Sequence, residues 1–154
     1  MEKLTEGGLS GLFFLDENHG WAVGGNGVIL KYTDGTWTME NSGTTMHLND
    51  VFFTSEDNGW AAGYVRMHYT GNQWITIDTI GYGGITDVFF TDENNGWAGG
   101  PQKFYHYDTT GWHWYSLGFS EYYSVNSIFF SDSVHGWIGG SYSDDYKYLS
   151  LIHI

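Results

Sequence analysis

The segment Asp50-Val51-Phe52-Phe53-Thr54 and the segment Gly59-Trp60-Ala61-Ala62-Gly63 that follows it decide the fold, because the chain contains this combination four times. In every copy the Phe-Phe pair precedes the Gly-Trp pair by seven residues. The four copies are Phe13-Phe14 with Gly20-Trp21, Phe52-Phe53 with Gly59-Trp60, Phe89-Phe90 with Gly96-Trp97, and Phe129-Phe130 with Gly136-Trp137. They recur at intervals of 39, 37 and 40 residues. This period predicts a stack of small repeats, none of which buries its apolar surface without a neighbour.

Each copy predicts four short strands joined by turns rich in Asn, Asp and Gly, residues that tolerate positive φ. In the second copy the strands lie around Val51-Phe52-Phe53, around Trp60-Ala61, up to Tyr69 and from Trp74. A Lys/His-Tyr pair marks the third strand of every copy: Lys31-Tyr32, His68-Tyr69, His106-Tyr107 and Lys147-Tyr148. The Trp that opens the fourth strand is Trp37, then Trp74, and in the third copy either Trp112 or Trp114.

The adjacent phenylalanines favour one all-β architecture over the others. Neighbouring residues of a strand point to opposite faces of its sheet, so one Phe of each pair would face water in a sandwich. In a β-propeller each sheet packs against the next and both faces are buried. We therefore predict a partial β-propeller of about four blades, each of four antiparallel strands, with repeats at about 9–42, 43–80, 81–121 and 122–148.

The repeat pattern stops after Tyr148. The last residues, Leu149-Ser150-Leu151-Ile152-His153-Ile154, match what an in-frame read through a common transposase sequencing adapter would encode. We therefore expect residues 149–154 to be a non-native tail; a short hydrophobic terminal strand is the alternative. No Trp stands upstream of Phe13 at the fourth-strand spacing, so we expect the chain to be a fragment, an open arc of a larger propeller.

Composition excludes several classes of partner. The formal net charge is −13, with only five Lys and Arg residues, which disfavours a phosphate backbone or an anionic membrane surface. No apolar run is long enough to span a bilayer. The absence of cysteine excludes disulfides and cysteine-ligated metals. No cofactor motif is present, and we predict neither a metal nor a cofactor.

Two stretches of the first copy resemble a known group. Gly20-Trp21-Ala22-Val23-Gly24 and Thr33-Asp34-Gly35-Thr36-Trp37 resemble the repeat of photosystem II stability/assembly-factor-like proteins, within the bacterial neuraminidase (Asp-box) repeat group. The resemblance covers roughly Leu9 to Tyr148 and implies a propeller and an extracellular or cell-envelope location. The Asp-box itself is degraded, as in Thr70-Gly71-Asn72-Gln73-Trp74, which weakens the assignment to a subfamily.

Asp50 and Asp87 occupy the same repeat position, two residues before the first Phe. The first strand is innermost in a propeller, so these carboxylates are candidates for ligand binding at the mouth of the central channel. Hydrogen bonding at the strand start is the simpler explanation, and we favour it. Arg66 and Lys103 also align with each other, six residues past their Trp. They are candidates for gripping an anionic partner, although ordinary surface charge is the favoured interpretation.

The remaining polar clusters predict turns and surfaces. The acidic stretches Asp16-Glu17-Asn18, Glu56-Asp57-Asn58 and Asp92-Glu93-Asn94 offer oxygen ligands for calcium but lack the alternating spacing of a calcium loop. Solvated turns explain them better. We expect His19 and His135 in turns, and His68 and His106 at a strand edge or surface.

These observations favour a non-catalytic scaffold that binds protein or carbohydrate. The alternative is a fragment of an Asp-box-containing glycoside hydrolase, sialidase-like or glucanase-like. Sialidases need several arginines, and this chain has only Arg66. Other glycosidases need two carboxylates that flank a cleft, and Asp50 with Asp87 is the only pair that we would test. A purely structural surface repeat is a third possibility, and ligand identity and oligomeric state stay open.

Overall fold

The computed structural model describes residues 8–117, 123–142 and 152–153, and most of these lie in short strands or in the turns between them. Four antiparallel sheets, which we call blades 1 to 4, follow one another along the chain. Blade 1 contains β1 (Leu9–Phe14), β2 (His19–Gly24), β3 (Ile29–Thr33) and β4 (Thr36–Glu40), with the 3-10 turn η1 (Gly25–Gly27) after β2. Blade 2 contains β5 (Leu48–Ser55), β6 (Asn58–Gly63), β7 (Val65–Tyr69) and β8 (Trp74–Thr79).

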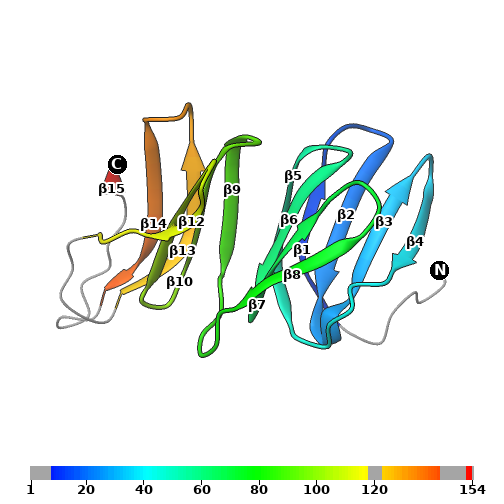
Figure 1. Ribbon diagram of the computed structural model, residues 1–154, viewed down its shortest axis with the longest axis horizontal. Coiled ribbons are helices and arrows are strands. Elements are labelled where there is room, and N and C mark those ends of the chain that lie inside the picture. The colour runs from blue at the N-terminus through cyan, green and yellow to red at the C-terminus, as the bar shows by residue number, and fades with distance from the viewer. Residues whose placement is uncertain (1–7, 118–122, 143–151, 154) are drawn as a thin grey trace.

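Blades 3 and 4 continue the series. Blade 3 contains β9 (Asp87–Asp92), β10 (Asn95–Gly100), β11 (Lys103–Asp108) and β12 (Gly111–Trp114). Blade 4 has three strands among the described residues: β13 (Tyr123–Phe130), β14 (Gly136–Tyr142) and β15 (Ile152–His153). The sheets stand side by side in chain order, with blade 1 at the right of Figure 1 and blade 4 at the left. The predicted all-β class and blade arrangement are confirmed. Within the described residues, no helix has the length and hydrophobicity that a membrane crossing requires.

The Phe-Phe pairs of blades 2 and 3 each contact both neighbouring blades, as predicted, whereas Phe14 of blade 1 and Phe129 of blade 4 are exposed. The second Phe faces the preceding blade: Phe53 stacks on Trp21, with ring centroids 3.5 Å apart and an interplanar angle of 10°. The first Phe faces the following blade, since the ring centroid of Phe13 lies 4.7 Å from that of Phe52. Burying one large apolar side chain in this way stabilises the fold by roughly 1.5–3 kcal/mol. The blades therefore adhere mainly through these aromatic rings.

The glycine of the Gly-Trp motif makes room for the second Phe of its own blade. Gly59 lies directly opposite Phe53 in the register of β5 and β6. A Cβ atom added at Gly59 would collide with the Phe53 ring, and one at Gly96 or Gly136 would collide with Phe90 or Phe130 in the same way. Glycine is therefore required at this position, because the ring of the second Phe lies over the second strand where a side chain would otherwise stand.

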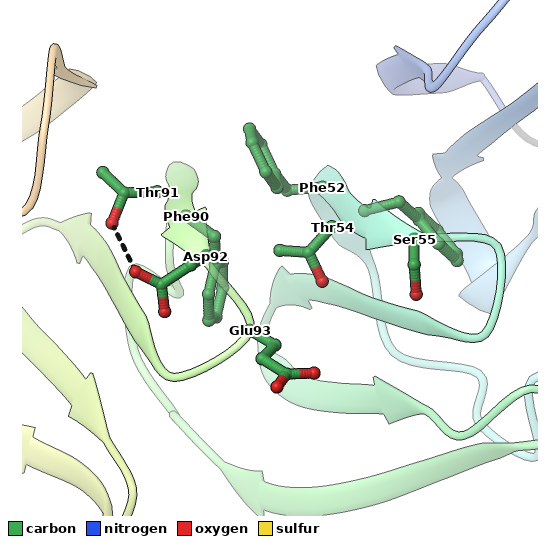
Figure 2. Close-up of a pocket in the computed structure, with 8 residues that line it drawn as sticks. Phe52, Thr54, Ser55, Phe90, Thr91, Asp92 and Glu93 are labelled. Atoms are coloured by element: carbon green, nitrogen blue, oxygen red, sulfur yellow. Dashed lines mark hydrogen bonds between the residues drawn. The ribbon is translucent and has the colours of Figure 1, made fainter.

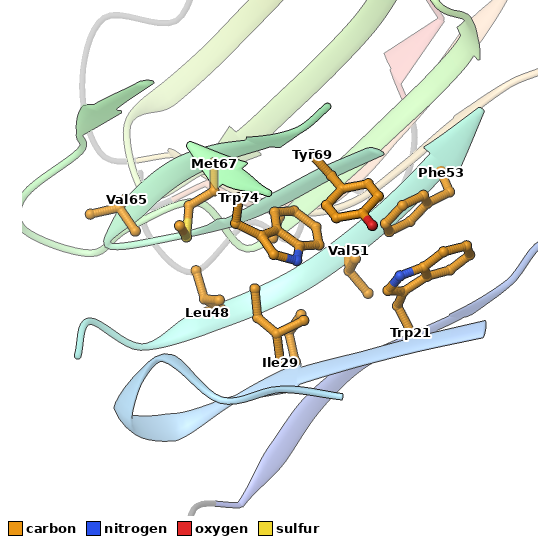
Figure 3. Packing of buried hydrophobic residues seen from close by; sticks show 11 residues of the cluster. Trp21, Ile29, Leu48, Val51, Phe53, Val65, Met67, Tyr69 and Trp74 are labelled. Carbon is orange, nitrogen blue, oxygen red and sulfur yellow. The ribbon is translucent and has the colours of Figure 1, made fainter. Parts of the chain in front are cut away.

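The hydrophobic core lies between the sheets rather than within any one of them. The first of three clusters joins blades 1 and 2 (Figure 3). It contains Trp21 and Ile29 from blade 1, packed against Leu48, Val51 and Phe53 from blade 2. The second cluster joins blades 2 and 3 around Trp60 and Phe90, and the third joins blades 3 and 4 around Trp97 and Phe130. This arrangement keeps the first strands of successive blades side by side along the inner edge.

The structure decides which Trp opens the fourth strand of blade 3, and it places a different residue than expected on the third strand of blade 4. Tyr107 pairs with Trp112, just as Tyr32 pairs with Trp37 and Tyr69 with Trp74, so Trp112 is the fourth-strand Trp of blade 3. In blade 4 the residue opposite Trp137 is His153, at the position that Lys31, His68 and His106 take in the other blades. Lys147 and Tyr148, which the spacing placed there, lie outside the described residues. The repeat boundaries and the assignment of 149–154 as a non-native tail stay predictions.

Candidate functional site

The two ends of the strands carry different charges. Because the strands alternate in direction, the turn between the first and second strands and the turn between the third and fourth lie at the same end of each blade. We call this end the turn face; it comprises segments 15–18, 34–35, 56–57, 70–73, 92–94, 108–110 and 131–135. Its acidic residues are Asp16, Glu17, Asp34, Glu56, Asp57, Asp92, Glu93, Asp108 and Asp132. These segments contain no Lys or Arg, so the turn face is strongly acidic.

Local hydrogen bonds hold several of these carboxylates in their ionised form. Asp16 accepts from the backbone N–H groups of Asn18 and His19, and Asp132 accepts from those of Val134 and His135. The hydrogen bond from His19 lowers the pKa of Asp16, and the backbone bond from Val134 lowers that of Asp132. Bonds from the Thr110 side chain and backbone lower the pKa of Asp108 to about 2. Asp16, Asp108 and Asp132 therefore lie in hydrogen-bonded turns that favour their ionised form.

An open groove of about 500 Å³ crosses the turn face between blades 2 and 3 (Figure 2). Phe52, Phe53 and Phe90 are among its lining residues. Because the ring of Phe53 stacks on Trp21 of blade 1, the aromatic rings on the side of blade 3 are those of Phe52 and Phe90. Asp92, the last residue of β9, and Glu93, in the turn that follows, are exposed at its border. The groove thus combines an apolar lining with negative charge at its rim.

One cluster on the turn face has side chains of the types that ligate metals. Oxygen and nitrogen atoms of Asp16, His19 and Glu56 lie within 4.8 Å of one another. However, His19 Nδ1 is hydrogen-bonded with Asp16 Oδ2 at 2.9 Å, and this bond raises the pKa of His19. A raised pKa favours the imidazolium, the form of histidine that does not bind metals. A contact of 3.6 Å between His19 Nε2 and Glu56 Oε2 makes this cluster an ionic link between blades 1 and 2.

Asp50 and Asp87 meet at the opposite end of the blades. Asp50 Oδ2 accepts from the backbone N–H of Val88 at 2.9 Å, and Asp87 Oδ2 accepts from that of Ile128. Each carboxyl therefore ties the start of its own first strand to the first strand of the next blade. This is the strand-start hydrogen bonding that the sequence favoured, although it crosses from blade to blade. A ligand-binding role for the two residues stays a prediction.

The two carboxyls also contact each other and share a proton. Burial is the largest cause that raises the pKa of both groups. The hydrogen bond with Asp50 and the charge of Asp50 raise the pKa of Asp87 further, to about 8. In contrast, the bond from Asp87 favours the ionised form of Asp50. One carboxyl of the pair therefore carries a proton at neutral pH and donates it to the other.

Arg66 is not the surface charge that the sequence favoured. It is only 5% exposed, and its guanidinium donates two hydrogen bonds to the Asp78 carboxylate, through Nε at 2.9 Å and through Nη2. The guanidinium carbon lies 4.4 Å from the ring centroid of Tyr105 and 4.8 Å from that of Trp112, both in blade 3. Arg66 Nη1 is buried with no hydrogen-bond partner among the described residues. The charge of Arg66 is thus engaged between two blades.

Lys103 is engaged separately. Its ammonium group donates to the backbone carbonyl of Tyr82, in the loop before blade 3, and burial lowers its pKa. Arg66 and Lys103 therefore have different partners, and the structure does not present them as one free cationic pair. Anion binding by these residues stays a prediction.

His68 and His106 are not edge residues either. The His68 ring stacks on Trp60 of the adjacent strand, with centroids 4.3 Å apart, and its Nε2 is hydrogen-bonded with Asn58 Oδ1 at 2.6 Å. His106 makes the equivalent contacts with Trp97 and Asn95. Burial lowers the pKa of both histidines. These rings pack against the Trp of the adjacent strand within their own blade.

Comparison with known proteins supports the fold. No protein-family model and no curated protein matches the chain. The structure is similar to that of YCF48 from Cyanidioschyzon merolae, with a TM-score of 0.68 and 20% identity over 87% of this chain and 48% of that chain. It is also similar to the structure of YCF48 bound to D1 peptide, with a TM-score of 0.63 and 21% identity over 87% of this chain and 51% of that chain.

The chain therefore spans about half the length of these two structures. At such low identity the likeness concerns the fold and not the site residues. It confirms the fold that the sequence resemblance implied: the chain has a β-propeller fold like that of YCF48.

Proposed function

We propose that this chain is a non-catalytic propeller scaffold that binds a segment of a partner protein on its turn face, across the groove between blades 2 and 3. One observation carries the proposal: nine carboxylates lie on a face that also holds a groove lined by Phe52 and Phe90. Loops that a rigid scaffold brings to a common face serve recognition.

The charge and lining of the groove define the kind of segment that fits. Lys or Arg side chains complement Asp92 and Glu93 at the rim and accelerate encounter with the acidic face. An apolar side chain of the segment fits against the aromatic lining, where contact with water is lost. We therefore infer that the partner segment is basic and carries at least one large apolar residue.

The comparisons support a peptide as the class of ligand, because YCF48 has been solved bound to D1 peptide. That finding concerns YCF48; for this chain it favours protein over carbohydrate. The resemblance to assembly-factor-like repeats agrees with a scaffold role. An extracellular or cell-envelope location belongs to the same proposal and rests on the resemblance alone.

No specific observation favours the glycoside hydrolase alternative. The pair that it needs, Asp50 and Asp87, consists of two carboxyls hydrogen-bonded to each other and to the backbone of the next blade. Glycosidases keep their two carboxyl groups apart, about 5 Å or more, so that the sugar or a water molecule fits between them. The two carboxyl groups of Asp50 and Asp87 contact each other and leave no such space between them.

A binding experiment tests the proposed function. The probe is a labelled synthetic peptide with a central pair of leucines flanked by lysines, titrated with the protein by fluorescence anisotropy. We expect saturable binding that weakens with salt, because rim charges act through screened electrostatics. The combined change of Asp92→Asn and Glu93→Gln is expected to lower the affinity about tenfold.

Two controls localise the site. Ser55→Trp places a bulky side chain at an exposed position of the groove and is expected to block binding. Asp34→Asn removes one charge from the turn face of blade 1 and is expected to change the affinity by no more than about twofold. Equal binding of a peptide with glutamate in place of lysine would refute the proposal, as would binding that survives both groove variants unchanged.

A further inference from the structure

Blades 1 and 4 carry the same histidine–aspartate pair at the edge of the turn face. In both blades an Asp stands three residues before a His that directly precedes the Gly-Trp motif. His19 Nδ1 lies 2.9 Å from Asp16 Oδ2, and His135 Nδ1 lies 2.8 Å from Asp132 Oδ2. The groove runs between blades 2 and 3, so the repeat places one such pair on either side of it.

Blade 3 has a third pair, built from different elements. His113, on β12, lies with its Nε2 atom 3.2 Å from Asp108 Oδ1 and 2.7 Å from Thr110 Oγ1. The side chains of both His113 and Asp108 are exposed to solvent. His106 is the other titratable group that acts on this pair, because it lies opposite His113 in the register of β11 and β12. The turn face therefore has three histidines, each beside one of its own carboxylates.

His19 connects its pair to the border of the groove. Besides Asp16, it faces the carboxylates of Asp34 and of Glu56, and Glu56 Oε2 lies 3.6 Å from His19 Nε2 across the blade boundary. Glu56 directly follows Ser55, which lines the groove. The hydrogen bond with Asp16 is the largest cause that raises the pKa of His19. Protonated His19 thus neutralises charge at the border of the groove.

Histidine is the group through which the turn face gains positive charge near neutral pH. The turn-face segments contain no Lys or Arg. Imidazole changes its charge between pH 5 and pH 8, whereas Asp and Glu side chains ordinarily ionise near pH 4. Lowering the pH through this range therefore adds positive charge at all three histidines, on a face that carries nine carboxylates. A basic ligand is attracted less strongly as a result.

We propose that these three histidines regulate the binding site by pH: the turn face holds its basic partner segment at pH 8 and releases it as the histidines take up protons. This inference rests on the proposed function, because it concerns the same face and the same ligand. One screened surface charge changes affinity by about twofold at physiological salt. Three protonations are therefore expected to weaken binding about eightfold between pH 8 and pH 5.5. The coupling is reciprocal, so the bound segment displaces protons from the protein.

Peptide binding measured at two pH values tests the inference. The probe is the lysine–leucine peptide, capped at both ends and labelled with a dye that does not titrate between pH 5.5 and pH 8. We expect the affinity of the wild type to fall about eightfold between pH 8 and pH 5.5. The triple variant His19→Gln, His113→Gln and His135→Gln is expected to bind equally at both pH values to within about twofold. His47→Gln is the control, because His47 is hydrogen-bonded with Ser10 at the opposite end of the blades, and it is expected to keep the wild-type pH dependence.

Calorimetry on the wild type gives a second readout that needs no variant. Peptide binding at pH 6.5, measured in buffers of different ionisation enthalpy, is expected to release protons. Equal affinity at pH 8 and pH 5.5, or binding without proton release, would overturn this inference and leave the proposed function standing. A pH dependence that persists unchanged in the triple variant would overturn it too. Absence of binding at pH 8 would instead refute the proposed function, and this inference with it.

Discussion

Asp87 is a single residue that makes the free energy of unfolding of this fold depend on pH. Its carboxyl group is partly buried beside Asp50, and it accepts a hydrogen bond from the backbone of blade 4. Burial and the neighbouring carboxylate raise its pKa from the ordinary 3.8 to about 8. Between these two values the folded protein binds this proton more tightly than the unfolded chain does. The contribution of Asp87 to the free energy of unfolding therefore falls as pH rises from about 4 to about 8.

Asp87→Asn is expected to remove this dependence. The amide does not titrate; its NH₂ group can donate to Asp50, and its oxygen can accept from the Ile128 N–H. We expect the variant to gain stability relative to wild type as pH rises through this window, and to gain least near pH 4. Thermal unfolding of both proteins at several pH values measures the difference. A constant difference across the window would show that Asp87 does not hold the proton.

The contacts of Asp50, Asp87 and Arg66 could not be predicted from the sequence. The alignment of Asp50 with Asp87 was visible in the repeat, but their mutual contact depends on how closely two first strands approach. The burial of Arg66 was not visible, because its partner Asp78 lies on the next strand and its aromatic cover, Tyr105 and Trp112, comes from the next blade. The only signal was that the strand after Arg66 contains a carboxylate.

At the scale of the strand pair, the Gly-Trp motif is explained by one steric fact. The glycine opposes the second Phe of the same blade, whose ring lies across it. The following Trp points to the next blade and stacks on that blade's second Phe. Two adjacent residues thus serve two different interfaces, which explains why they recur together.

Gly59→Ala tests this explanation. The added methyl group collides with the ring of Phe53, which is 1% exposed and has little room to move. We expect a loss of about 1–3 kcal/mol in the free energy of unfolding, the usual cost of overpacking a core. Denaturant unfolding, monitored by tryptophan fluorescence, measures this loss.

Gly139→Ala is the matched control, because its added methyl group would lie 3.9 Å from the nearest atom. It also sits in a second strand, after the Trp of its blade. We expect its stability to stay within about 0.5 kcal/mol of wild type, as for most surface substitutions. Equal losses at Gly59 and Gly139 would contradict the steric explanation.

At the scale of the whole molecule, the sequence predicted the stack of blades well because the Phe-Phe and Gly-Trp motif occurs four times. The intervals, the adjacent phenylalanines and the Tyr-to-Trp spacing fixed the sheets, their buried faces and the strand order. The groove and the acidic turn face were not predicted. The groove depends on the separation of β5 and β9, and the face depends on the fact that alternate turns meet at one end. Both features arise from packing between repeats, which no single repeat contains.

The central claim is that successive sheets adhere through the Phe of one blade and the Trp of the blade before it. A double-mutant cycle between Trp21→Leu and Phe53→Leu tests it most directly, with Trp21→Leu and Phe90→Leu as the control pair two blades apart. We expect a coupling energy of about 0.5–1.5 kcal/mol for Trp21 with Phe53, as for stacked aromatic pairs. The control pair is expected to be additive to within about 0.5 kcal/mol. Additivity of Trp21 with Phe53 would contradict the account.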